Sequence, residues 1–238
     1  MTTLELDDLM AVRGKFTLGP VSVSLDRGEI LGLCGANGSG KTTLINVILG
    51  TLLPAAGSMT IFGQSADLDG RSYMRRVGFV PDESTTLFDE LTASEHVRLT
   101  IARRDGAARS DQVRRRSEVL LEALELHPDR MLARSFSHGM KKKLQIVLAL
   151  MHEPDLLIVD ELRNGLDPLS ARTAESLIVE AAGRGTTIIV ATHDLFWVER
   201  LNLRVLLLRA GEVCAAGSAS ELVRDGGSLE DSFVRMYS

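Results

Sequence analysis

The stretch GANGSGKTT, residues 35–43, decides the fold of this chain. It matches the pattern G-x-x-x-x-G-K-[ST] at every fixed position, which is typical of loops whose backbone N–H groups surround phosphates. The apolar run 30–34 comes directly before it, and residues 41–49, followed by Gly50, have the pattern of a helix. A buried strand, a glycine-rich loop and a helix in this order predict a phosphate site in an α/β fold. The residues expected to bind there are Gly35, Asn37, Gly38, Ser39, Gly40, Lys41, Thr42 and Thr43.

An acidic pair, Asp160 and Glu161, follows the apolar run 156–159. Taken alone, such a pair is most often an ordinary surface turn. A nucleotide hydrolase, however, needs a carboxylate for its metal and a group that orients water. Lys41 can reach the β- and γ-phosphates and the Thr42 hydroxyl can ligate Mg²⁺. The two motifs together therefore predict a nucleotide and Mg²⁺, with Asp160 as a further metal ligand and Glu161 beside the water.

The composition is that of an ordinary globular protein, because 45% of the 238 residues are apolar and 25% are charged. The net charge of −5 gives no general attraction to nucleic acid, and aromatic residues that could stack bases make up only 4%. The two cysteines, Cys34 and Cys214, favour a reducing cytosol over a disulfide framework. No run approaches the ~18 apolar residues that cross a bilayer, so we expect any membrane role to come through a partner.

Further along the chain, apolar runs predict alternating strands and helices. Residues 156–160 and 186–192 have the pattern of buried strands, and a helix is expected between them at 168–182. This βαβ order is typical of a parallel sheet. Residues 84–152 instead carry helical periodicity almost throughout. We therefore expect a single domain over residues 1–238, with a helical subdomain of residues 84–152 inserted into a parallel-sheet core.

A second stretch, SFSHGMKKKL at residues 135–144, also has the pattern of an anion site. Ser137 can cap a helix that begins there, and Gly139 allows a close approach to its backbone. The first N–H groups of a helix lack partners and carry partial positive charge, so they attract anions. An ordinary capped helix beside a solvated lysine run is the alternative interpretation.

The order of these motifs resembles the nucleotide-binding domain of ATP-binding cassette (ABC) transporters over nearly the whole chain. The specific features are FSHGM at 136–140, which corresponds to the signature motif, NGLDP at 164–168, which corresponds to the D-loop, and THD at 192–194, which contains the switch histidine. A signature ending in GM resembles the bacterial export-type branch. The resemblance implies an α/β fold: a P-loop NTPase core with an antiparallel β subdomain and an inserted α-helical subdomain.

The resemblance also implies an ATPase that powers a transporter and works as a pair. Two such domains face each other head to tail, with ATP between the phosphate loop of one and the signature of the other. Glu161 would then polarise the attacking water, His193 would contact the γ-phosphate, and Asp167 would cross the interface and couple the two sites. The signature residues expected at the partner's nucleotide are Ser137, His138, Gly139 and Met140.

Two departures from the family pattern concern the nucleotide. The position where the family stacks an aromatic side chain on adenine is Val12 here, so adenine is expected to be held more weakly or by Phe16, with reduced discrimination between ATP and GTP. The position of the metal-binding glutamine is Asp82, which can still ligate Mg²⁺ but cannot donate a hydrogen bond. We interpret this acid as variation within the export-type branch.

Two further departures lie in the signature and the D-loop. His138 replaces the middle glycine of the signature. Its ring can turn away from the nucleotide, or it can bind protonated and add an anion contact. Leu162 and Arg163 stand where Pro-Thr is usual, and the sequence does not indicate which partner Arg163 meets.

The expected partners are a second copy of the chain and a separately encoded transmembrane permease, at the cytoplasmic face of the membrane, with no nucleic acid. Export is favoured; an importer ATPase and a non-transport ABC ATPase are the alternatives. The basic clusters are expected to be solvated helix faces, with anionic lipid headgroups or the permease as alternative contacts. These clusters are Arg103–Arg104, Arg109, Arg114–Arg116 and Lys141–Lys143.

Overall fold

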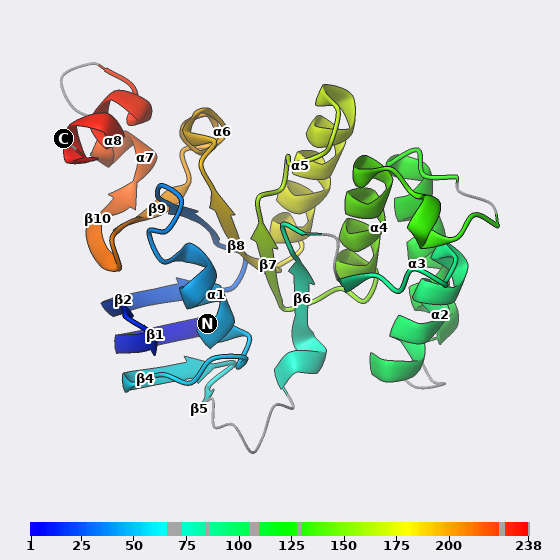
Figure 1. Ribbon diagram of the computed structural model, residues 1–238, viewed down its shortest axis with the longest axis horizontal. Helices are drawn as coiled ribbons and strands as arrows, with labels where there is room; N and C mark the ends of the chain where they lie inside the picture. The colour runs from blue at the N-terminus through cyan, green and yellow to red at the C-terminus, as the bar shows by residue number, and fades with distance from the viewer. Residues whose placement is uncertain (66–72, 84–85, 105–109, 128–129, 224–226, 238) are drawn as a thin grey trace. The chain divides into compact units, whose positions relative to one another are not determined.

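The fold is that of a computed structural model, which describes residues 1–65, 73–83, 86–104, 110–127, 130–223 and 227–237. Of the basic residues named above, Arg109 lies outside these ranges. The chain divides into two compact units, each with its own core. Unit 1 comprises Met1–Met74 and Thr187–Ser238, and unit 2 comprises Arg75–Thr186. Figure 1 labels the elements of both units.

Unit 1 begins with an antiparallel sheet in the strand order β2-β1-β4-β5. Buried and exposed side chains alternate along β2, with Val21, Val23 and Leu25 on the buried face. This alternation is expected when one face of a sheet packs on a core and the other meets water. The strands are β1 (Thr2–Arg13), β2 (Phe16–Asp26), β4 (Ala56–Ile61) and β5 (Gln64–Ser65). The expected antiparallel subdomain is confirmed.

A second set of strands in unit 1 is mainly parallel, with β3 paired in parallel to both β8 and β9 and with β10 antiparallel to β9. β3 and β8 are buried almost throughout, as the continuous apolar runs predict. These strands are β3 (Ile30–Cys34), β8 (Thr187–Thr192), β9 (Arg204–Arg209) and β10 (Glu212–Ser218). The helices of unit 1 are α1 (Lys41–Ile48), α6 (Leu195–Arg200), α7 (Ala219–Leu222) and α8 (Leu229–Tyr237).

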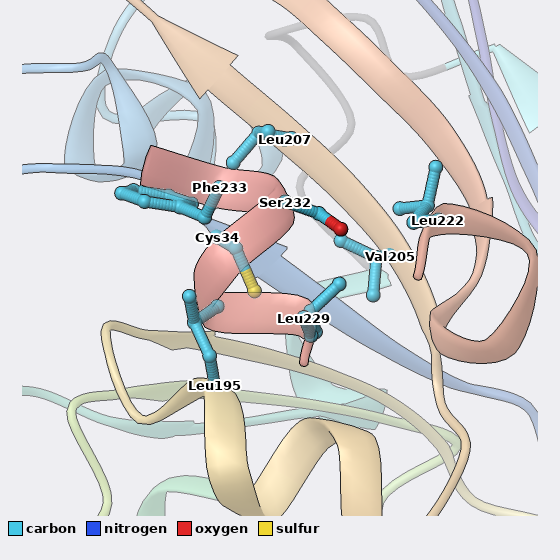
Figure 2. Close-up of a pocket in the computed structure, with 8 residues that line it drawn as sticks. All are labelled: Cys34, Leu195, Val205, Leu207, Leu222, Leu229, Ser232 and Phe233. Carbon is cyan, nitrogen blue, oxygen red and sulfur yellow. The ribbon is translucent and has the colours of Figure 1, made fainter. Parts of the chain in front are cut away.

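A small apolar pocket lies where α8 packs on this set of strands. Figure 2 shows the buried Cys34 thiol pointing toward the Leu229 end of α8. Neither Cys34, which is buried, nor Cys214, which is exposed, forms a disulfide. Leu195, Val205, Leu207, Leu222 and Phe233 complete the lining.

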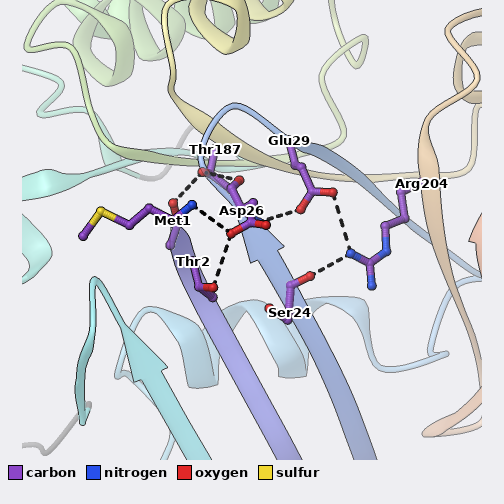
Figure 3. A network of polar contacts seen from close by, with 8 residues as sticks. Met1, Thr2, Ser24, Asp26, Glu29, Thr187 and Arg204 are labelled. Atoms are coloured by element: carbon purple, nitrogen blue, oxygen red, sulfur yellow. Dashed lines mark hydrogen bonds and ion pairs between the residues drawn. The ribbon is translucent and has the colours of Figure 1, made fainter.

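A polar network joins the two sets of strands within unit 1 (Figure 3). The Thr187 hydroxyl at the start of β8 donates to the Asp26 carbonyl at 3.0 Å and to Thr3 Oγ1 at 2.8 Å. Arg204 at the start of β9 donates to the Ser24 carbonyl at 2.7 Å and lies 3.8 Å from a carboxylate oxygen of Glu29. These contacts fix the chain where it passes from the antiparallel strands into β3.

Unit 2 contains a parallel strand pair and a group of helices. β6 (Val77–Val80) pairs with β7 (Leu156–Asp160), with Val80 opposite Val159. The helices gathered in green in Figure 1 are α2 (Ala93–Arg104), α3 (Ser110–Ala123) and α4 (His138–Leu150), with the short 3₁₀ turn η3 (Ala133–Ser135) before α4. α5 (Pro168–Gly183) follows β7, close to the expected helix 168–182. The α-helices α2 to α4 lie within residues 84–152, but the limits of that subdomain stay a prediction.

One buried histidine of unit 2 is held neutral. His152, only 8% exposed, accepts a hydrogen bond at Nε2 from an Arg104 guanidinium nitrogen 2.7 Å away. The same nitrogen donates to the Val77 carbonyl at 2.7 Å. Burial, and after it the Arg104 charge, lowers the pKa of His152 from 6.5 to about 3.

Because of this histidine, the stability of the fold is expected to decrease as the pH falls. Since the folded pKa lies below the unfolded value, the contribution of His152 is complete above about pH 6.5 and is lost as the pH falls toward 3. We expect the free energy of unfolding to drop by roughly 1 kcal/mol per pH unit between about pH 6 and 5. His152→Gln, which does not titrate, should flatten this slope in urea titrations, whereas the exposed His127→Gln should not. An equal slope in all three proteins would contradict the assignment.

Candidate functional site

The phosphate loop lies between β3 and α1 in unit 1. Gly35, Gly38 and Gly40 have φ angles of 155°, 79° and 116°, in the region that favours glycine. Lys41 folds back over the loop, and its ammonium donates to the Gly35 carbonyl at 2.7 Å and the Ala36 carbonyl at 3.3 Å. An ammonium held at the loop backbone is well placed for a phosphate oxygen.

The geometry of the loop fits a polyphosphate. No side chain caps the N-terminus of α1 among the described residues, and its first turn holds no acidic residue, so its N–H groups face no competing acceptor there. The buried Ser39 Oγ has no hydrogen-bond partner in the part of the chain described. A Cβ on Gly35 would lie 2.4 Å from that Oγ, whereas a Cβ on Gly38 would meet nothing within 4 Å. The loop is therefore tight at its start and open above Gly38.

His193 follows the strand next to the one that leads into the loop. Cys34 and Thr192 are paired in register at the ends of the parallel strands β3 and β8. The carboxyl ends of neighbouring parallel strands meet at one sheet edge, so the loop and His193 begin at the same edge within unit 1. His193 is exposed, and the next residue, Asp194, caps α6 by accepting a hydrogen bond from the Trp197 N–H at 3.1 Å.

The two residues considered for adenine differ in their relation to the loop. Val12 is 49% exposed on β1 and pairs with Thr17 of β2. Phe16 is half-buried at the start of β2, and its Cζ lies 3.2 Å from where a Cβ on Gly40 would be. The aromatic ring beside the phosphate loop is therefore that of Phe16.

In unit 2, strand pairing brings the predicted acidic residues together. β6 and β7 end in register, so Asp82 follows one strand and Asp160 ends the other. Asp160 is 8% exposed, and Glu161 has a φ of 50°, a conformation that a non-glycine residue rarely adopts. The Asp82 carboxylate accepts a hydrogen bond from the Asn164 side-chain amide at 2.7 Å. Asn164 belongs to the NGLDP motif, but no pattern in the sequence indicates this contact.

The described residues include no group of three or more His, Cys, Asp or Glu side chains that could enclose a metal. Mg²⁺ does not require one, because it is usually held by one or two carboxylates, waters and the substrate phosphates. Within unit 2, Asp82 and Asp160 therefore fit Mg²⁺ bound together with a nucleotide better than Mg²⁺ bound alone, and in unit 1 the Thr42 side chain is exposed.

The signature motif forms the start of α4. Ser137 is the N-cap, and its hydroxyl accepts a hydrogen bond from the Met140 N–H at 3.2 Å, as predicted. Phe136, just before it, is buried in a cluster with Leu87, Leu126 and Leu144, which anchors the motif. Ser137 and His138 themselves are exposed.

The signature packs closely against the NGLDP segment. A Cβ on Gly139 would lie 2.7 Å from the Gly165 carbonyl oxygen, so only glycine allows this approach. The His138 ring lies over Gly165, where a Cβ would come within 1.8 Å of its Cδ2. His138 therefore packs on the D-loop of its own chain.

Asp167 and Arg163 have partners in their own chain. Asp167 caps α5 by accepting hydrogen bonds from the Leu169 and Ser170 N–H groups, both at 3.0 Å. Hydrogen bonds from the Ser170 hydroxyl and N–H are the main reason that the pKa of Asp167 falls to about 2. Arg163 lies 3.3 Å from a carboxylate oxygen of the buried Glu175, which answers the question of its partner. The role of Asp167 at a dimer interface stays a prediction.

The expectation of a solvated lysine run is wrong for Lys142. Lys141 and Lys143 are partly exposed, but Lys142 is only 1% exposed and is among the largest fully buried side chains in the described part of the chain. Its ammonium reaches backbone carbonyls near the ends of β6 and β7, which no pattern in residues 141–143 indicates.

Comparison with known proteins identifies the family. Residues 18–164 match the family described as ABC transporter. The chain belongs to the ABC transporter family. It is 34% identical to the ABC-type transporter ATP-binding protein EcsA of Bacillus subtilis, over all of this chain and 96% of EcsA. It is also 34% identical to a fluoroquinolones export ATP-binding protein of Mycobacterium tuberculosis, over 92% of this chain and 73% of that protein.

Solved structures agree with this assignment to the ABC ATPases. The ATP binding subunit of an ABC transporter has a TM-score of 0.91 and 33% identity, over 99% of this chain and all of that one. A dimeric post-hydrolysis structure of the ATP-binding cassette MJ0796 with ADP and Pi has a TM-score of 0.79 and 26% identity, over 91% and 98%. The predicted family and P-loop NTPase fold are confirmed.

The chain is thus an ATP-binding and ATP-hydrolysing subunit of an ABC transporter, as predicted. None of the described helices has the length and apolarity to cross a membrane.

Proposed function

We propose that two copies of this chain bind two Mg²⁺-ATP molecules head to tail, each nucleotide lying between the phosphate loop of one copy and the signature of the other. The observation that carries this proposal is the exposed start of α4, where Ser137 caps the helix beside two residues that pack on the D-loop. One chain thus carries a phosphate loop and a second helix N-terminus suited to an anion. The dimeric MJ0796 cassette, which is bound to ADP and Pi, supports a pair of chains with nucleotide.

Each side chain has a proposed role in hydrolysis. Lys41 and the N–H groups of its loop would hold the phosphates, and Thr42, Asp160 and Asp82 would hold Mg²⁺. Bound there, Mg²⁺ would supply positive charge that offsets the negative charge of the phosphate oxygens. Glu161 would orient the attacking water and accept its proton, and His193 would contact the γ-phosphate. The Ser137 hydroxyl and Gly139 N–H of the second copy would stabilise that phosphate from the other side.

Adenine is proposed to lie near Phe16 rather than Val12. The position of the Phe16 ring beside Gly40 supports this choice, since a base attached to phosphates at the loop has to pass close by. A ring that is partly buried offers less surface for stacking than a fully exposed one. This agrees with the expectation of weak discrimination between ATP and GTP.

We further propose that the dimer docks at the cytoplasmic face of the membrane on a separately encoded transmembrane permease. ATP binding would close the dimer and hydrolysis would reopen it, which moves the permease between its access states. The fluoroquinolones export protein among the relatives supports export rather than import.

The test is whether ATP makes the chain dimerise. Glu161→Gln should retain ATP, so with Mg²⁺-ATP we expect light scattering to report twice the 25.9 kDa chain mass, and with ADP or without nucleotide the single mass. The same variant carrying Lys41→Ala is the control and should stay monomeric in ATP. A Glu161→Gln chain that binds ATP and remains monomeric at all concentrations would overturn the shared-site proposal.

A further inference from the structure

One buried cation joins three segments of the site in unit 2. Lys142 lies on α4, five residues after the capping Ser137, and its ammonium donates to the Pro81 carbonyl at 2.8 Å and the Asp160 carbonyl at 3.0 Å. Pro81 directly precedes Asp82, and Asp160 directly precedes Glu161. A single side chain therefore holds the backbone beside both predicted acidic segments and ties it to the signature helix.

The next turn of α4 strengthens this connection. The Gln145 amide donates to the Glu83 carbonyl at 2.9 Å and to the Thr86 hydroxyl at 3.1 Å. Gln145 is also buried, and residues three apart on a helix share one face. Lys142 and Gln145, on one face of the signature helix, thus donate to the backbone carbonyls of Pro81 and Glu83, on either side of Asp82.

The charges around Lys142 explain why a lysine can be buried here. Burial lowers the pKa of the Lys142 ammonium from 10.5 to about 8, and the charges of Asp82, Asp160 and Glu161, of which Asp82 has the largest effect, oppose this shift. A buried ammonium without such partners would be very unfavourable. The most direct reason for a cation at this place is therefore the negative charge of the acidic residues, including the acid that replaces the usual glutamine at Asp82.

We propose that Lys142 is a positioning residue for ATP hydrolysis, which fixes Asp82 and Asp160 for Mg²⁺ and offsets the charge of Asp82. The inference rests on the proposed function in one respect, because it takes Asp82 and Asp160 as ligands of Mg²⁺. Lys142 touches neither nucleotide nor metal in this scheme. It acts through the backbone of Pro81 and Asp160, so a movement of the signature helix would be passed to both acidic segments through this side chain.

The test compares Lys142→Met, which removes the ammonium but keeps the length, with Lys141→Met on the same helix. Lys141 lies 3.4 Å from Asp89 and is partly exposed, so its loss is a matched change of charge. Outer partners of metal ligands typically contribute a factor of about 10 to 100 in metal affinity or activity. We expect Lys142→Met to lower kcat by at least about tenfold and to raise the Mg²⁺ concentration needed for tight ATP binding by a similar factor. ATP binding without Mg²⁺ should be unchanged, and Lys141→Met should match the wild type.

A second variant pair tests the charge. Lys142→Met leaves the Asp82 carboxylate without its cation, so adding Asp82→Asn should restore part of the melting temperature of the nucleotide-free protein. Lys142→Gln, which keeps one donor, serves in place of Lys142→Met if the latter does not fold, with intermediate effects expected. The proposal would be overturned if the Lys142 variants melted at a lower temperature but kept kcat and the Mg²⁺ dependence of ATP binding within twofold of wild type. It would also be overturned if adding Asp82→Asn restored none of the lost melting temperature. ATP binding and its dependence on Mg²⁺ can be measured on a monomer. The effect of Lys142→Met on Mg²⁺-dependent ATP binding can therefore be determined even if the chain does not dimerise.

Discussion

Glu161→Gln is expected to lower the rate of ATP hydrolysis by a factor of about 100 or more while ATP binding stays near its wild-type strength. Gln has the same shape as Glu and can still orient a water, but it cannot accept the proton that the water loses. The loop that binds the phosphates belongs to other residues and is untouched. Single-turnover hydrolysis and equilibrium ATP binding, measured on the same sample, separate the two effects.

The chain offers a matched control for this substitution. Glu125 is exposed at the end of α3 and has the same φ of 50° as Glu161. Glu125→Gln therefore makes the same chemical change at a residue with the same φ angle, away from the predicted site, and should hydrolyse ATP at the wild-type rate. A loss of ATP binding in Glu161→Gln, or hydrolysis within tenfold of wild type, would count against Glu161 as the base.

The parts of the fold that follow from local chemistry were predictable from the sequence. The phosphate loop needs its glycines, lysine and threonine next to one another, and a buried parallel strand needs a continuous apolar run, as in 156–160 and 186–192. The Ser137 cap is also local, because a helix N-terminus is completed within three residues. The alternation in β1 is harder to recognise, because register shifts between Leu6 and Leu9 and between Leu9 and Ala11 interrupt it.

The site residues that sequence analysis missed depend on contacts between distant segments. Lys142 resembles its exposed neighbours until the carbonyls of Pro81 and Asp160, 61 and 18 residues away, are seen around its ammonium. Asn164 has its role only because Asp82, 82 residues earlier, lies beside it. Arg163 likewise finds Glu175 across a loop and a turn of α5. Such partners are set by the fold, and the sequence near each residue carries no sign of them.

Mixing two inactive variants is expected to restore ATP-dependent dimerisation, if each nucleotide is shared by two chains. All chains carry Glu161→Gln so that ATP is retained; one chain adds Lys41→Ala and the other adds Ser137→Asp. Aspartate caps a helix as well as serine does, so α4 should stay intact while its charge repels the partner's phosphates. A dimer made of one variant alone would have a defect in both nucleotide sites, so each variant alone should stay monomeric. A mixed dimer has one site with an intact Lys41 facing an intact Ser137, so the mixture should dimerise with one ATP per dimer.

The same experiment distinguishes a shared site from a site contained in one chain. If Lys41 and Ser137 of the same chain acted on one ATP, every site in the mixture would still carry a defect, and the mixture would equal the sum of the separate variants. Ser137→Asn is the control for the charge, because it keeps the cap without adding repulsion. Its melting temperature should equal that of Ser137→Asp, and it should weaken ATP-dependent dimerisation much less. If both variants lost ATP-dependent dimerisation equally, the effect would come from the Ser137 hydroxyl or the cap. If only Ser137→Asp lost dimerisation, and mixing restored it, the start of α4 would lie against the partner's triphosphate.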